Sequence, residues 1–116
     1  MKELMEISQN KVNWGNIVIN KRLSESFIEK YKDMLNWDWV SCYQKLSESF
    51  IEKFKDRVNW NCISIYQKLS QSFIERHKDE VDWRKISAHQ KLSSVFIEKH
   101  KDDVNWGEYI LLSKTI

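Results

Sequence analysis

Histidine and cysteine are the residues of this chain best suited to metal binding or nucleophilic chemistry. They are His77, His89, His100, Cys42 and Cys62. A zinc site needs ligands about 2 Å from the metal, and these residues show no recognised ligand spacing such as CxxC. The three histidines occupy positions that hold Tyr or Phe in other parts of the chain. We therefore expect them to pack as aromatic residues, and we expect neither a metal nor another cofactor.

The repeated serines are the other candidates for catalysis. A serine nucleophile needs an adjacent base, and none accompanies these residues in the sequence. The serines fall into two groups, predicted helix caps (Ser24, Ser47, Ser70, Ser93) and small packing residues within helices (Ser41, Ser64, Ser87). We expect no enzyme activity.

Alternating acidic and basic residues recur in the strings FIEKYKD, FIEKFKD, FIERHKD and FIEKHKD. No copy is marked out from the others as a catalytic acid–base pair. Glu and Lys three positions apart on a helix attract each other weakly. We interpret Glu29, Lys30, Lys32, Asp33 and their copies as a solvated helix face.

The composition is that of a single helical domain. The 116 residues include no Pro, two Gly and 31% charged residues, which suits helices joined by tight turns. Six Trp and 41% hydrophobic residues indicate a packed core. The net charge of +2 does not by itself imply a polyanionic partner.

Location is predicted from the same composition. The N-terminal stretch MKELMEISQNKVNW lacks a secretory apolar segment, and no apolar run is long enough to span a membrane. Two cysteines without CxxC spacing favour unpaired thiols in a reducing compartment. We expect a cytoplasmic protein.

A period of 23 residues organises the chain. It relates the tryptophans Trp14, Trp37, Trp60, Trp83 and Trp106, and it also relates Phe27, Phe50, Phe73 and Phe96. A fixed period in this range is typical of stacked supersecondary units. The units span about 1–22, 23–45, 46–68, 69–91 and 92–116, with atypical terminal units, in one domain over residues 1–116.

Each unit contains two signals for the start of a helix. Ser24 is a good N-cap between Leu23 and Ile28, which have the spacing of a hydrophobic staple, and Asn59 is the equivalent cap in the sequence VNWNCI. Two caps per unit predict short helices at residues 25–33 and 37–45, too short to be stable alone. The fold class is therefore all-α, an α-solenoid of about five short helix pairs.

Apolar residues at helical spacing predict the core. The first helix of a unit places Phe, Ile and Tyr31 or Phe54 on one face, and the second places Trp, Val or Ile, and Tyr43 or Tyr66 on one face. The repeated Trp is interpreted as a packing residue in preference to a stacking platform for bases or sugars.

Positions that differ between units are those that packing does not dictate. They cluster around the turn between the two helices and predict a partner-binding rim of Trp39, Met34, Arg57, Asn61, Arg84 and Lys85. Trp39 is the one tryptophan outside the repeat, so it either anchors a partner or covers a gap in its unit. Arg57, Arg84 and Lys85 form a weak basic patch, which supports nucleic-acid binding as the alternative function.

The chain ends depart from the repeat. Leu4 and Met5 replace the Phe and Ile of the first helix, and Gly15 and Gly107 follow the terminal tryptophans. The apolar C-terminal residues either cover the last core layer or form a homodimer through Tyr109, Ile110, Leu112 and Ile116.

The consensus L-S-x-x-F-I-E-K-(aromatic)-K-D-x-V-N-W-x-x-I-S-x-Y-Q-K resembles short repeat arrays in uncharacterised proteins of phages and large DNA viruses. The resemblance covers nearly the whole chain, but Val18 and Ile110 replace Ser in the terminal copies. It implies a protein that binds a host defence complex, such as an antiviral nuclease, and inhibits it in the host cytoplasm. The expected function is thus a non-enzymatic protein-binding scaffold.

Overall fold

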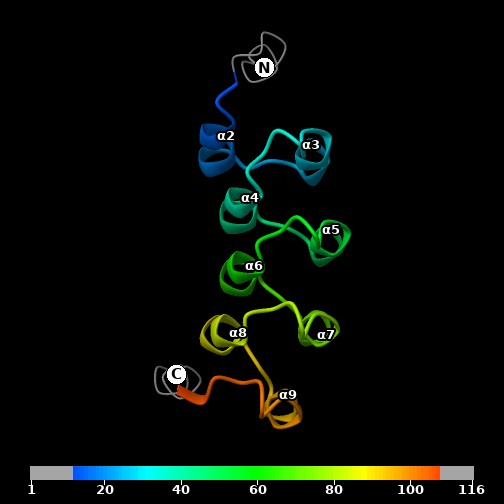
Figure 1. The fold of residues 1–116 in the computed structure, drawn as a ribbon, viewed down its shortest axis with the longest axis vertical. Coiled ribbons are helices and arrows are strands. Elements are labelled where there is room, and N and C mark those ends of the chain that lie inside the picture. Colours follow the sequence, from blue (N-terminus) through cyan, green and yellow to red (C-terminus); the bar gives the residue numbers. More distant parts are fainter. Residues whose placement is uncertain (1–11, 108–116) are drawn as a thin grey trace.

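The computed structural model describes residues 12–107, and within them the regular secondary structure consists of α-helices joined by short turns and extended segments. Its helices alternate between two columns (Figure 1). One column holds the B helices, which begin at the repeated Trp: α2 (Trp14–Asn20), α4 (Trp37–Tyr43), α6 (Trp60–Tyr66) and α8 (Trp83–His89). The other holds the A helices: α3 (Glu25–Lys30), α5 (Glu48–Lys53), α7 (Gln71–Arg76) and α9 (Ser94–Lys99).

Both columns follow the 23-residue period. Along the B column, α2 packs on α4, α4 on α6, and α6 on α8. The principal extents of 54 × 27 × 16 Å describe an elongated slab one helix pair wide. No helix within residues 12–107 is long and apolar enough to cross a membrane. The predicted first helix with Leu4 and Met5, and the C-terminal residues Tyr109, Ile110, Leu112 and Ile116, lie outside the described residues.

The predicted N-caps are confirmed. Ser24 Oγ accepts a hydrogen bond from the Phe27 backbone N–H at 3.1 Å, and Asn59 Oδ1 accepts one from Cys62 N–H at 3.2 Å. The equivalent caps are Asn13, Asn36, Ser47, Ser70, Asp82 and Ser93. Each cap satisfies a backbone donor that the first turn leaves without a partner.

The helices are shorter than the nine residues predicted, with six in each A helix and seven in each B helix. The A helix α3 ends at Lys30, after which Met34 N–H donates to Tyr31 O at 2.9 Å and closes a turn. The B helix α4 ends at Tyr43 because Gln44 adopts an extended backbone (φ −100°, ψ 146°). That conformation directs the chain to the next A helix.

The core lies between the two columns. Ile28, Val40, Ile51, Ile63 and Phe73 are fully buried. Four tryptophans of the repeat are partly buried against this core (Trp14, Trp37, Trp60, Trp83). The indole N–H groups of Trp37, Trp60, Trp83 and Trp106 each donate to a backbone oxygen five residues earlier, at 2.9–3.1 Å. The prediction that the repeated Trp serves packing is confirmed for the four that contact the core.

A buried glutamine connects each unit to the one before it, a role that the sequence pattern did not reveal. Gln67 Nε2 donates to Ser41 O at 3.0 Å and to Gln44 O at 2.7 Å, and its Oε1 accepts from Leu46 N–H at 3.0 Å. Gln44 and Gln90 make the same three kinds of bond. Because these amides are buried, the bonds fix the register between neighbouring units.

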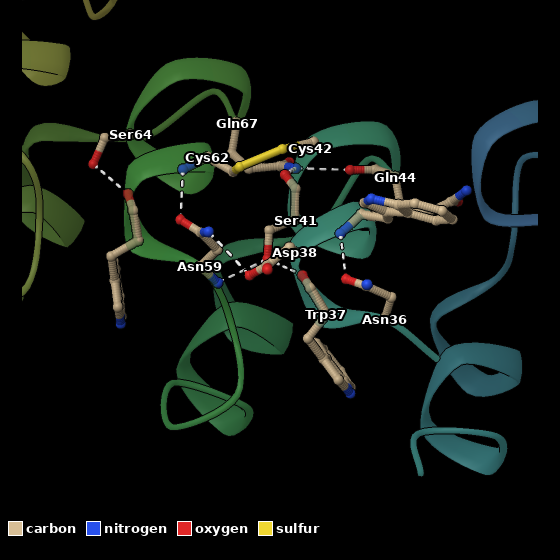
Figure 2. Close-up of a disulfide and its surroundings, with 12 residues drawn as sticks. Asn36, Trp37, Asp38, Ser41, Cys42, Gln44, Asn59, Cys62, Ser64 and Gln67 are labelled. Atoms are coloured by element: carbon tan, nitrogen blue, oxygen red, sulfur yellow. Dashed lines mark hydrogen bonds between the residues drawn. A yellow bond between two sulfur atoms is a disulfide. The ribbon is translucent and has the colours of Figure 1, made fainter. Parts of the chain in front are cut away.

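The mid-helix serines also join units. Ser41 Oγ donates to Trp37 O at 2.7 Å and accepts from Asn59 N–H, in the next unit, at 2.9 Å (Figure 2). Ser64 and Ser87 repeat this arrangement. These serines are small, as predicted, but their hydroxyls hold the cap of the following B helix in place.

Three ion pairs among the described residues join one unit to the next. Lys53 pairs with Glu29, Lys99 with Glu75 at 2.7 Å, and Arg57 with Asp33 at 2.9 Å. Successive A helices lie side by side, so a residue faces its counterpart about one period later. The expected solvated face is present, with charge pairs that cross it from unit to unit.

Candidate functional site

Trp39 lies over Gly15 of the preceding B helix. A Cβ atom at position 15 would overlap the Trp39 ring, so the absence of a side chain there makes room for the indole. Trp39 nevertheless retains 40% of its surface exposure. The contact with Gly15 therefore supports the interpretation that Trp39 covers a gap, and the anchoring of a partner by the exposed part of the ring stays a prediction.

The remaining rim residues come from three successive units of the repeat. Met34 is 53% exposed, Asn61 and Arg84 are exposed, and Lys85 is half-buried. Arg57 pairs with Asp33 and donates from Nη1 to Lys32 O at 3.3 Å. Both partners of Arg57 belong to the preceding unit, which therefore holds this side chain. The predicted basic patch of Arg57, Arg84 and Lys85 thus includes one residue with a structural role.

Cys42 and Cys62 are joined in a disulfide between α4 and α6 (Figure 2). The prediction of two unpaired thiols is wrong. Neighbouring B helices run in the same direction, and their close packing brings the Cα atoms of these residues to 5.1 Å. The equivalent pairs in flanking units are Ile19 with Trp39 and Ile65 with Lys85, which contain no cysteine. The cysteines therefore no longer indicate a reducing, cytoplasmic location.

His77 and His100 are buried in the aromatic core, as predicted. The His77 ring lies 5.1 Å from the Trp60 ring and 4.6 Å from the Phe73 ring, measured between centroids. Its Nε2 contacts Glu52 of the preceding unit, and its Nδ1 lies 3.1 Å from Glu80 Oε1. His100 has the same surroundings, with Glu75 and Asp103 as its acidic neighbours.

Within residues 12–107, no group of three His, Cys, Asp or Glu is arranged to hold a metal ion. The pKa of Glu75, the acidic neighbour of His100 in the preceding unit, is shifted. A hydrogen bond from Lys99, together with one from His100, lowers the pKa of Glu75. This carboxylate is partly exposed and serves to join two units.

Two tyrosines recur in the repeat although they are exposed and, among the described residues, have no packing role. Tyr43 and Tyr66 are 57% and 62% exposed, so the prediction that they belong to the apolar stripe of the B helix is wrong. At 3.6 residues per turn, a residue six positions after the Trp points about 120° away from it. His89 occupies the same position in α8 and is also exposed.

A basic residue follows each of these rings by two positions. Arg22 occupies the equivalent basic position of the preceding unit, where no ring is present. We name the combined set the Tyr–Lys row, and it consists of Arg22, Tyr43, Lys45, Tyr66, Lys68, His89 and Lys91. All its basic side chains are exposed, and among the described residues none of them makes a salt bridge. The rings lie at the C-terminal ends of α4, α6 and α8.

Open grooves separate successive members of the row. The groove between Tyr43 and Tyr66 has a volume of about 520 Å³, and Lys45 and Lys68 also line it. Between Tyr66 and His89 the volume is about 400 Å³, and between Ile19 and Tyr43 it is about 350 Å³. No acidic residue lines these three grooves. The buried glutamines form part of each lining, so the groove walls are held by hydrogen bonds.

Repetition alone does not distinguish packing residues from exposed ones, so the Tyr–Lys row is not among the site residues predicted from the sequence. One signal was available, since Tyr-Gln-Lys appears twice and His-Gln-Lys once at the same place in the period. A Lys that recurs beside an aromatic residue at a helix end is poorly explained by a core position.

No protein-family model, curated protein or solved structure matches this chain.

Proposed function

We propose that this chain is a non-enzymatic α-solenoid scaffold that binds a protein partner along the Tyr–Lys row. One observation carries the proposal: Tyr43 and Tyr66 repeat in register, are exposed, and make no side-chain hydrogen bond or ring contact within the described residues. The repeated Gln, Ser and Trp side chains, in contrast, all have a bonding role inside the array.

Exposed tyrosines beside grooves are typical of protein interfaces. Tyrosine contributes a large rigid surface and a hydroxyl group at a small cost in side-chain entropy. A row of grooves, one between each pair of neighbouring units, also offers several weak contacts in series to one elongated partner. The resemblance of the repeat to viral and phage arrays supports a host defence protein as that partner.

The proposal is tested by affinity capture from host cells with a Tyr43→Ala/Tyr66→Ala variant as bait. Val95→Ala is the control, because Val95 is an exposed apolar residue that lies outside both the row and the predicted rim. Circular dichroism establishes that both variants are folded. We expect the double variant to lose a partner that wild type and Val95→Ala retain, and retention by all three proteins contradicts the proposal.

A second candidate function is nucleic-acid binding, which the alternation of exposed rings and basic side chains favours. Single strands bind to proteins through base stacking on aromatic rings and through cationic contacts to phosphate. Titration of a labelled single-stranded oligonucleotide at low salt tests this candidate, because phosphate contacts are strongest there. It predicts binding that the Tyr43→Ala/Tyr66→Ala variant loses.

A further inference from the structure

The grooves of the Tyr–Lys row carry charge of one sign. Arg22, Lys45, Lys68 and Lys91 supply one basic side chain per unit along the row, and no Asp or Glu lines the grooves between them. The whole chain has a net charge of only +2. The excess of positive charge is therefore local, and it is complementary to an acidic partner.

The spacing of the row matches an extended polypeptide. Packed helices lie about 8–10 Å apart, which sets the distance between equivalent residues of neighbouring B helices. A polyproline II segment has three residues per turn and a rise of about 3.1 Å per residue, so it repeats about every 9 Å. Every third residue of such a segment can meet the same position in successive units.

The rings and the helix ends decide between a peptide and a nucleic acid. Grooves lined by aromatic rings are a recurrent docking site for polyproline II segments. The C-terminal ends of α4, α6 and α8 place partial negative charge beside the row, which offsets part of the basic charge. One cation per unit then suits spaced carboxylates better than a continuous chain of phosphates.

We propose that the Tyr–Lys row binds an acidic, extended segment of its partner protein in the polyproline II conformation. A carboxylate at every third residue pairs with Arg22, Lys45, Lys68 and Lys91 in turn. The residues between the carboxylates occupy the grooves flanked by Tyr43, Tyr66 and His89. This inference rests on the proposed function, because it assigns a chemical class to the same partner.

Fluorescence anisotropy with a labelled peptide of repeated Glu-Pro-Pro tests the inference. Peptides of repeated Glu-Pro and of repeated Lys-Pro-Pro, matched in length, test the spacing and the charge, and a thymidine oligonucleotide tests nucleic acid. We expect the full-length protein to bind Glu-Pro-Pro at least about tenfold more tightly than the other three probes. Equal or tighter binding of any of these probes overturns the inference, as does an absence of binding to Glu-Pro-Pro.

Charge reversal locates the interaction. Lys45→Glu/Lys68→Glu is expected to weaken Glu-Pro-Pro binding by at least about tenfold. Lys55→Glu/Lys78→Glu makes the same change at exposed positions outside the row and is expected to leave binding within about twofold. Circular dichroism and thermal unfolding check the fold of both variants. An equal loss in both variants overturns the assignment to the row.

The peptide experiment tests the chemical class of the partner, and the capture experiment tests the proposed function. If Glu-Pro-Pro does not bind but capture of the partner still requires Tyr43 and Tyr66, the class of partner is wrong and the proposed function stands. If capture does not require these tyrosines, the proposed function itself is wrong.

Discussion

The indole of Trp39 lies on Gly15, one unit earlier in the array. The two residues are exceptions to the repeat, and the structure shows that they are exceptions together. Cys42 and Cys62 form a second such pair. Part of the variation between units is thus compensatory across the seam between B helices, as the Gly15–Trp39 contact and the Cys42–Cys62 pair show.

The contact between Gly15 and Trp39 predicts a coupling energy. Gly15→Ala adds a methyl group against the ring in wild type, whereas in a Trp39→Ala background it meets no ring and gains helix propensity of up to about 1 kcal/mol. We expect the substitution to be at least about 0.5 kcal/mol less favourable when Trp39 is present. Urea unfolding of the four proteins measures this double-mutant cycle, and equal effects in both backgrounds contradict the contact.

The buried amide of Gln67 is predicted to be essential to the array. Gln67→Leu leaves Ser41 O, Gln44 O and Leu46 N–H without their partner in the interior. The expected loss in the free energy of unfolding is at least about 3 kcal/mol. Gln71→Leu is the matched control, because the Gln71 side chain accepts one hydrogen bond at an exposed site, and it should cost less than about 1 kcal/mol. Similar losses in the two variants would show that the buried bonds are not responsible.

The disulfide is predicted to stabilise the seam between α4 and α6. It closes a loop with a sequence separation of 20. The lost conformational entropy raises the free energy of the unfolded chain by about 3 kcal/mol. We expect a reducing agent to lower the denaturation midpoint of wild type and to leave that of Cys42→Ser/Cys62→Ser unchanged. A thiol titration of the denatured protein checks the oxidation state, and two free thiols in the isolated native protein would refute the pairing.

The lowered pKa of Glu75 predicts a loss of stability in acid. Hydrogen bonds from Lys99 and then from His100 favour the carboxylate, so the pKa in the folded state lies below the ordinary value of 4.5. The stabilisation is present above pH 4.5 and is lost as the pH falls below 4.5 through the lowered pKa.

Unfolding free energies from about pH 6 to about pH 3 measure this effect. The stability difference between wild type and Glu75→Gln should shrink as the acid limit is approached. Glu98→Gln is the control, because Glu98 is the exposed equivalent of Glu75 one unit later. A difference that does not change with pH would remove the carboxylate from the acid response.

Local structure was predictable from the sequence because its determinants are close together along the chain. The Ser24 and Asn59 caps bond to N–H groups three residues away, and those bonds are present in the structure. The repeated Trp and Ile residues were assigned to the core for the same reason, since helical spacing places them on one face. The 23-residue period in turn predicted the recurrence of both helices.

Contacts between units depended on the tertiary structure. The distance and rotation from one unit to the next determine which side chains meet across a seam. The sequence of a single repeat determines neither quantity. This distance and rotation bring Cys42 to Cys62, place the Gln67 amide against the preceding unit and set Trp39 over Gly15.

The exposure of the repeated side chains also depended on the three-dimensional arrangement. The candidate site depended on it for the same reason. Tyr43 and Tyr66 fit an apolar stripe by residue type, but the seven-residue B helix turns them away from the core. The sequence by itself determined the helices, their caps and their repetition, because these arise from interactions within about one helical turn. The tertiary structure decided which repeated residues remain available to a partner, because that depends on how the units stack.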